Sequence, residues 1–337
     1  MAYFWPDMQR SMTHRCLNGF LLAGLLILLR PDLYAQSFLV PSDTFSQSRF
    51  YTIAASGALI YGSTVVGLNQ AWYKDFAKTS FHFFDDRGEW LNMDKAGHIF
   101  TTYFESEISY QGAKWTGMKE RNAIWLGAGL GLFYQSTVEI FDAYSSRWGF
   151  SVADMLYNVV GATLFASQQA AWSEQRVRFK ISSWPKQYSS SPIQSTSGDF
   201  ASSLKKRANN LFGTGFFERY LKDYNAQTIW LSINPKSFFP LLNFPVWLNI
   251  SVGYGSENLY GGFSNSWMEG THSFSLDKKQ FPRSTQWFLA PDIDFKKIKT
   301  NNPLLKTVFS VLNIFKVPSP TLEYKSDGKL KWHWIFL

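Results

Sequence analysis

Long apolar stretches separated by short polar segments dominate the first half of the chain. Three uncharged stretches cover residues 51–72, 122–138 and 155–173. As helices, the first and third are long enough to cross a bilayer, and the second is at the lower limit. All three are rich in small residues, which allow helix backbones to approach closely. The pattern predicts a helical region over residues 47–175, either embedded in lipid or packed as a bundle beside a membrane.

From about residue 216 the hydrophobic period changes to two. Apolar and polar residues alternate over 229–233, 246–252 and 330–336. This alternation is typical of half-buried antiparallel strands. The predicted fold class is therefore α+β, with a helical bundle followed by a mostly antiparallel β region over residues 216–337.

Turn-forming and polar residues predict the connections. Ser, Pro, Gln and Thr dominate residues 182–203, which are expected to form a linker. Gly253-Tyr254-Gly255 is expected to form a turn or bulge, and a short helix is expected over 303–315. The predicted strands are too few for a conventional closed transmembrane barrel. We expect a sheet that is open and packs on the helices, or one that the helices help to close.

The beginning of the chain has the pattern of an exported protein. Arg10, His14 and Arg15 precede an uncharged, Leu-rich run over residues 16–29, and Ala35 supplies a small residue for cleavage. These features in this order predict a signal peptide over residues 1–35. The expected location is the cell envelope, at the outer membrane or the periplasmic face of a membrane.

Composition narrows the chemistry and the partners. The single cysteine, Cys16, lies within the predicted signal peptide, so the mature chain has no disulfide and no thiol nucleophile. The full chain has a net charge of +8 and 18% aromatic residues. This mildly basic, aromatic-rich composition suits an anionic envelope surface better than nucleic acid. We expect a membrane lipid or an envelope protein as partner and no nucleic acid; the oligomeric state is not specified by the sequence.

Polar residues interrupt the apolar helices at helical spacing. Residues three or four apart share a helix face, and lone buried charges cost several kcal/mol, so these side chains are expected to meet in one shared polar centre. Gly161 continues the same face one turn further on, where close helix contact requires a small residue. The predicted polar centre consists of Asp94, His98, Glu139, Asp142, Asp154 and Asn158.

The polar centre has a structural and a chemical interpretation. Structurally, Ser151 is placed to cap a helix with Asp154 at its third position, and Asp94 to cap the helix of His98. Chemically, His98 with the carboxylates suits a metal ion or an acid–base pair, and Arg147 suits a phosphate or carboxylate. The sequence contains no nucleophile elbow, metalloprotease motif or phosphate loop, so it specifies neither a reaction nor a cofactor.

These residues also support a resemblance over about residues 90–165. The chain resembles the YfiM family of predicted periplasmic lipoproteins and, more distantly, is similar to the membrane-embedded VanZ-like proteins. The C-terminal region of the chain resembles the extension of longer YfiM-like members. The chain lacks the lipobox cysteine that the short members carry. The resemblance implies an envelope location and no established activity. Its motifs are Asp94-Lys95-x-x-His98, Glu139-x-x-Asp142 and Gly149-Phe150-Ser151-x-x-Asp154-x-x-x-Asn158-x-x-Gly161.

Three hypotheses for function follow. The first is a non-enzymatic envelope protein, associated with the outer membrane, whose polar centre fixes helix packing. The second is an envelope hydrolase for a lipid or cell-wall precursor, with His98 as base and Glu139, Asp142 or Asp154 as metal ligand or orienting group. The third is a subunit of an export or outer-membrane assembly complex. The sequence leaves open whether the protein is an enzyme.

Overall fold

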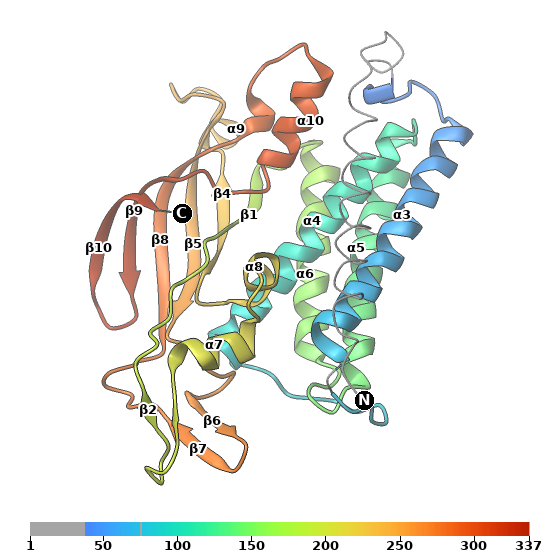
Figure 1. The fold of residues 1–337 in the computed structure, drawn as a ribbon. Helices are drawn as coiled ribbons and strands as arrows, with labels where there is room; N and C mark the ends of the chain where they lie inside the picture. The colour runs from blue at the N-terminus through green and yellow to red at the C-terminus, as the bar shows by residue number, and fades with distance from the viewer. Residues whose placement is uncertain (1–37, 75, 337) are drawn as a thin grey trace, which may run out of the picture.

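The structure is a computed structural model that describes residues 38–74 and 76–336. The predicted signal peptide over residues 1–35 lies outside the described residues. Long helices form a bundle on one side of the molecule, and a curled antiparallel sheet lies on the other (Figure 1). The predicted α+β class is confirmed.

Four long helices form the bundle: α3 (Gln47–Leu68), α4 (Met93–Trp115), α5 (Glu120–Ala143) and α6 (Val152–Trp172). α4 contacts α5 and α6 on one side and strands of the sheet on the other (Figure 1). A core cluster centred on Met93 joins α4 to the sheet. α4 therefore connects the two halves of the molecule.

Small residues bring the bundle helices into close contact. A Cβ atom at Gly161 would lie 2.5 Å from the carbonyl oxygen of Ile99, and one at Gly127 would lie 2.7 Å from that of Ser106. Any larger side chain at these positions would push α6 or α5 away from α4. The expected packing role of Gly161 is thus observed.

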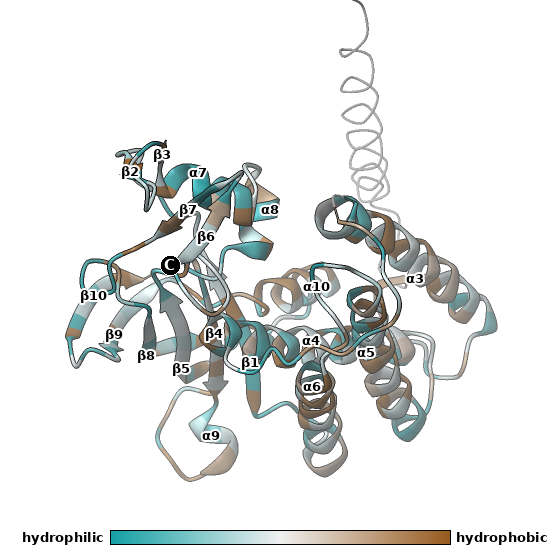
Figure 2. Cartoon of the chain, turned by 90° about the horizontal axis from the view of Figure 1, so that it is seen from below, coloured by the Kyte–Doolittle hydropathy of each residue, from teal (hydrophilic) through white to brown (hydrophobic). Residues whose placement is uncertain are grey.

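The interior of the bundle combines small and apolar residues with many polar side chains, and large apolar side chains lie on its outside. The buried positions of α5 and α6 include Gln135, Glu139 and Asn158, whereas Trp125 and Leu156 are exposed. The hydropathy colouring shows apolar segments along both helices (Figure 2). α3 has no buried residue, and among the described residues it alone is long and apolar enough to cross a membrane, judged by length and composition.

Six antiparallel strands form the main sheet in the order β1-β4-β5-β8-β9-β10. Two small hairpins, β2–β3 and β6–β7, and several short helices lie around it. The strands are β1 (Val177–Ser183), β2 (Ile193–Gln194), β3 (Ala201–Ser202), β4 (Gln227–Ile233), β5 (Leu248–Glu257), β6 (Ser266–Glu269), β7 (His272–Ser275), β8 (Ser284–Ile293), β9 (Ser319–Lys325) and β10 (Leu330–Phe336). The short helices are η1 (Asn69–Tyr73), η2 (Glu89–Asn92), α7 (Leu204–Phe212), α8 (Phe216–Lys222), α9 (Pro235–Phe238), η3 (Phe295–Lys297) and α10 (Pro303–Leu312).

The sheet, like the bundle, buries many polar residues on its inner face and exposes apolar residues on its outer face. Inside the curl, Lys180 and Asp292 form a fully buried ion pair of 2.8 Å, and Ser232 donates a hydrogen bond of 2.6 Å to Asp292. On the opposite face Val252 and Leu289 are cross-strand neighbours, and both are exposed. The interior face of the sheet therefore combines these polar groups with a buried aromatic cluster of Trp230 and Phe288.

The outer edge of β1 is covered by a segment from far along the chain. The backbone N–H of Ile181 donates to the carbonyl of Ile314 (3.0 Å), and the N–H of Lys316 donates to that of Ile181 (3.0 Å). Residues 314–316 lie just before β9, so the chain returns from the far side of the sheet to pair with β1. The sheet is thus partly closed by its own backbone as well as by packing against α4.

Two local expectations differ from the structure. Residues 182–203, predicted as a linker, contain the end of β1 and the β2–β3 hairpin, and Tyr188 packs against a buried core cluster. The prediction of a turn or bulge at Gly253-Tyr254-Gly255 is wrong: all three residues lie within β5. A Cβ atom at Gly253 would lie 2.7 Å from the Trp230 ring, so this glycine makes room for a buried indole. The division of the chain into separate domains stays a prediction.

Candidate functional site

The polar centre lies where α4 begins, α5 ends and α6 begins. The first turns of α4 carry Asp94 and His98, the last turns of α5 carry Glu139, and the first turns of α6 carry Asp154 and Asn158. Three helix ends therefore deliver these side chains to one place. The spacing of three or four residues along α4 and α6 places the side chains of each helix on the face that points to the polar centre.

Asn158 fixes the orientation of the His98 ring. The Nδ1 atom of His98 lies 3.0 Å from Oδ1 of Asn158. The Thr102 hydroxyl lies 2.9 Å from the same oxygen and 2.8 Å from the carbonyl oxygen of His98. With an acceptor oxygen facing Nδ1, that nitrogen acts as the donor, and Nε2 points to the other side of the ring.

Three carboxylates face Nε2 of His98. The oxygen atoms nearest to it are Oε1 of Glu139 at 3.7 Å, Oδ2 of Asp154 at 3.7 Å and Oδ1 of Asp94 at 3.9 Å. These distances are too long for hydrogen bonds. The ring nitrogen and the three oxygens thus surround a small common space.

Each of these carboxylates is held by a contact of its other oxygen. Oε2 of Glu139 accepts a hydrogen bond of 3.2 Å from the backbone N–H of Ser151. Oδ1 of Asp154 and Oδ2 of Asp94 lie 2.6 and 3.2 Å from the Nζ atom of Lys95. The oxygens that face His98 are therefore oriented by partners on their far side.

Lys95 and Asp86 belong to the same cluster, although they were not among the predicted site residues. Lys95 is buried, and its Nζ atom lies 2.7 Å from Asp86. Asp86 also accepts a hydrogen bond of 2.7 Å from the Ser151 hydroxyl. Asp86 comes from the loop before η2, which has no helical spacing, so the sequence pattern gave no indication of its position.

Three further expectations can be compared with the contacts observed. The Ser151 hydroxyl caps α6 by accepting from the Asp154 N–H (3.0 Å), as predicted. The capping role predicted for Asp94 is wrong, because Asn92 precedes the helix and the Asp94 carboxylate instead accepts from the Tyr224 hydroxyl (2.8 Å). Asp142 accepts from the Tyr73 hydroxyl (2.8 Å), at the periphery of the polar centre.

Acidic side chains outnumber basic side chains in the polar centre. Five carboxylates, those of Asp86, Asp94, Glu139, Asp142 and Asp154, surround the basic groups of Lys95 and His98. Burial raises the pKa of Glu139 to about 8 and that of Asp142 to about 7. The Oε1 atom of Glu139 is buried and has no hydrogen-bond partner among the described residues.

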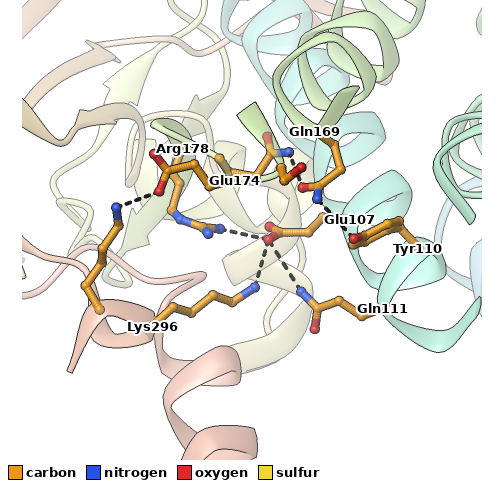
Figure 3. A pocket seen from close by; sticks show the side chains of 10 residues that line it. Glu107, Tyr110, Gln111, Gln169, Glu174, Arg178 and Lys296 are labelled. Atoms are coloured by element: carbon orange, nitrogen blue, oxygen red, sulfur yellow. Dashed lines mark hydrogen bonds and ion pairs between the residues drawn. The ribbon is translucent and has the colours of Figure 1, made fainter. Parts of the chain in front are cut away.

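A second polar cluster lies between the bundle and the sheet, beside an open cavity of about 400 Å³ (Figure 3). Glu107 of α4 is bound there by Arg178 of β1 at 2.8 Å and by Lys296 of η3 at 2.7 Å. We call this cluster the seam network; its members are Glu107, Glu174, Arg178, Asp294, Lys296 and Lys297.

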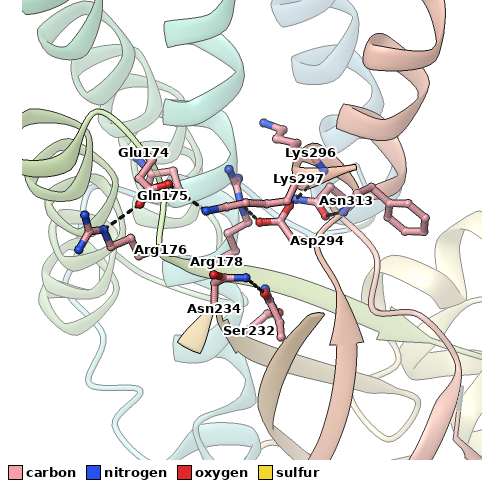
Figure 4. A network of polar contacts seen from close by, with 12 residues as sticks. Glu174, Gln175, Arg176, Arg178, Ser232, Asn234, Asp294, Lys296, Lys297 and Asn313 are labelled. Carbon is pink, nitrogen blue, oxygen red and sulfur yellow. Dashed lines mark hydrogen bonds and ion pairs between the residues drawn. The ribbon is translucent and has the colours of Figure 1, made fainter. Parts of the chain in front are cut away.

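Each acid of the seam network has a basic partner. Lys297 lies 2.9 Å from Glu174, and Arg178 lies 3.5 Å from Asp294 (Figure 4). Burial opposes ionisation of Glu107, but the charges of Arg178 and Lys296 outweigh it and lower its pKa to about 2. The network joins α4, β1 and the segment after β8. Its residues are single charges scattered over the sequence, and no spacing pattern links them.

Comparison with known proteins gives one match. Residues 82–169 match a family described as "Predicted periplasmic lipoprotein (DUF2279)". The matched segment includes all six predicted residues of the polar centre, and it supports an exported protein of the cell envelope. No curated protein and no solved structure is significantly similar to the chain.

Proposed function

We propose that the protein is a non-enzymatic, membrane-associated envelope protein whose bundle contacts lipid and is held together at one end by the polar centre. The observation that carries this proposal is the polarity of the bundle, with polar groups inside and large apolar side chains outside. A water-soluble bundle has the opposite arrangement. Membrane bundles place polar side chains in their interior, away from lipid.

The outer faces of three helices support lipid contact. Leu59 of α3, Trp125 of α5 and Leu156 of α6 are 72%, 67% and 62% exposed. α3 is attached to α5 through a hydrogen bond of 2.9 Å between the hydroxyls of Tyr61 and Thr137. Soluble monomers rarely expose apolar patches of this extent, so a lipid environment accounts for them.

The outer membrane or the periplasmic face of a membrane is the proposed location. The predicted signal peptide supports export, and the family match supports the envelope. The finer resemblance to YfiM-like and VanZ-like proteins stays a prediction, and a lipid or an envelope protein is the proposed partner.

Membrane fractionation of the full chain, expressed in a bacterial host, tests the proposal. We expect the wild-type protein to stay in the membrane pellet after high-salt and alkaline carbonate washes. Replacing Leu59 and Leu156 together by Arg should release it or make it aggregate. Met268→Arg is the matched control, since Met268 is 61% exposed on the β6–β7 hairpin, outside the bundle. Release of the wild-type protein by salt alone would show that the bundle does not contact lipid.

A hydrolase is the second candidate, favoured by the partly accessible His98, whose side chain is 13% exposed and whose Nε2 faces three carboxylates. Two assays of wild-type and His98→Ala protein distinguish the structural role from the hydrolase. The first is thermal melting in detergent, and the second is rescue of a deletion strain under envelope stress. A variant with a lower melting temperature supports the structural role. A variant that melts normally but fails to rescue the strain supports the hydrolase.

A further inference from the structure

We propose that the polar centre binds one divalent transition-metal ion through Nε2 of His98 and one carboxylate oxygen each of Asp94 and Asp154, with Oε1 of Glu139 as a fourth ligand. The inference deepens the proposed function, since it rests on the same polar centre and identifies what completes it. The ion would be the common partner of an imidazole nitrogen and three carboxylates that do not hydrogen-bond to it at their present distances.

The donor atoms have the spacing of a metal site. One ligand atom each from Asp94, His98 and Asp154 lie within 4.8 Å of one another. Donors arranged tetrahedrally about 2.1 Å from an ion are roughly 3.4 Å apart. The observed separations from Nε2 are 3.7 Å for Asp154 and 3.9 Å for Asp94, so these two pairs need to contract by only a few tenths of an ångström, and the two carboxylate oxygens lie within 4.8 Å of each other.

The residues that contact the proposed ligand side chains are of the kind that surrounds metal sites. Metal-binding histidines usually direct their other ring nitrogen to an acceptor, and here Asn158 faces Nδ1. Lys95 holds one oxygen each of Asp94 and Asp154, and the other oxygen of each faces His98. The Asp94 oxygen that faces His98 also accepts a hydrogen bond of 2.8 Å from the Tyr224 hydroxyl, which leaves it a second lone pair for an ion. Lys95 is thus placed behind the ligands, where it orients them without occupying the space between them.

Glu139 supplies an independent observation. It is 1% exposed, and its Oε1 atom lies 3.7 Å from Nε2 without a hydrogen-bond partner among the described residues. A buried carboxylate oxygen without a partner is costly. An ion bound beside Nε2 would supply that partner and would offset the excess of buried acids.

The ligand set selects the class of ion. One imidazole with carboxylate oxygens suits Zn²⁺ or Mn²⁺ better than Ca²⁺, which prefers oxygen ligands alone. The ion would enter beside Asp94, whose side chain is 21% exposed, since the side chains of Glu139 and Asp154 are nearly inaccessible.

Calorimetric titration of the detergent-purified, chelator-treated full chain with Zn²⁺ and Mn²⁺ tests the site. We expect one equivalent of at least one of the two ions to bind and to raise the melting temperature. Asp154→Asn and Asp94→Asn should each weaken binding at least tenfold. Glu105→Gln is the matched control on α4: Glu105 is bound to Gln135 (2.9 Å), away from His98, and the change should leave binding unaltered.

The outcomes separate this inference from the proposed function. Failure of both ions to bind, while the wild-type protein stays in the membrane and His98→Ala lowers its melting temperature, overturns the metal site alone. Stoichiometric binding that Asp94→Asn does not weaken also overturns it. If Asp154→Asn does not fold, Asp94→Asn decides, because Asp94 is the more exposed ligand. Binding by a protein that salt releases from the membrane supports the metal site and overturns lipid contact.

Discussion

The two polar clusters on α4 differ in how their charges are satisfied. In the seam network every acid has a basic partner, and Glu107 has two. In the polar centre the carboxylates outnumber the basic groups. Both clusters contain buried atoms without a hydrogen bond among the described residues, but Asp294 Oδ2 in the seam network faces the guanidinium of Arg178, whereas Glu139 Oε1 faces His98 and other acids. His98 and Glu107, which belong to the two clusters, lie about two and a half turns apart on α4. The fold alone accounts for the balanced cluster, whereas the unbalanced one requires a proton or an ion from solution.

Breaking the balanced cluster is expected to have the largest effect on stability. Arg178→Met removes a partner of both Glu107 and Asp294, and loss of one member of a buried ion pair costs about 3–5 kcal/mol. Chemical unfolding in detergent measures the change. As a control, Lys206→Met removes the exposed ion pair with Glu269 and should cost less than about 1 kcal/mol. Equal effects of the two changes would contradict a structural role for the seam network.

Replacing His98 should have a smaller effect on folding. Without added metal, His98→Ala leaves the oxygen of Asn158 with one partner fewer, which costs about 1–3 kcal/mol. The same unfolding measurement detects it. If the variant is more stable than the wild type, repulsion among the buried acids outweighs the contribution of the imidazole.

Asn158 tests the metal site indirectly, because it contacts Nδ1 of His98 and not the nitrogen proposed to bind the ion. Asn158→Ala removes the group that orients His98, and loss of such an outer partner lowers metal affinity about 10–100-fold. Asn158→Asp retains an acceptor oxygen and should restore most of the affinity for Zn²⁺ or Mn²⁺. Unchanged binding by Asn158→Ala would remove the orienting role of this residue.

Acid should weaken the seam network gradually. The pKa of Glu107 is lowered to about 2 from its usual 4.5, so its ionised form is favoured in the folded protein. Its stabilising contribution is fully present above pH 4.5 and is lost as the pH falls toward 2. Unfolding measured between these pH values should show less acid sensitivity in Glu107→Gln than in the wild type. Equal sensitivity would place the acid-labile group elsewhere.

The polar centre could be predicted because its residues repeat at helical spacing. The seam network could not, because Glu107, Arg178 and Lys296 lie on a helix, a strand and a short turn without a common period. β1 was missed for a related reason. Its alternating residues Arg178 and Lys180 have the pattern of a solvent-facing side, but this sheet buries its polar face. A hydrophobic period identifies the two faces of a strand without saying which one is inside.

The pairing of β1 with residues 314–316 constrains the order in which the protein can fold. The four bundle helices precede β1 along the chain. Their contacts with one another can therefore form during synthesis, as soon as α6 has left the ribosome. The edge of β1 stays uncovered until the last tenth of the chain arrives, and an uncovered edge invites pairing with other chains. A protein truncated before residue 314 would keep its bundle but would leave the edge of β1 unpaired and able to pair with other chains. Covering of the β1 edge is therefore a late event in the synthesis of the chain.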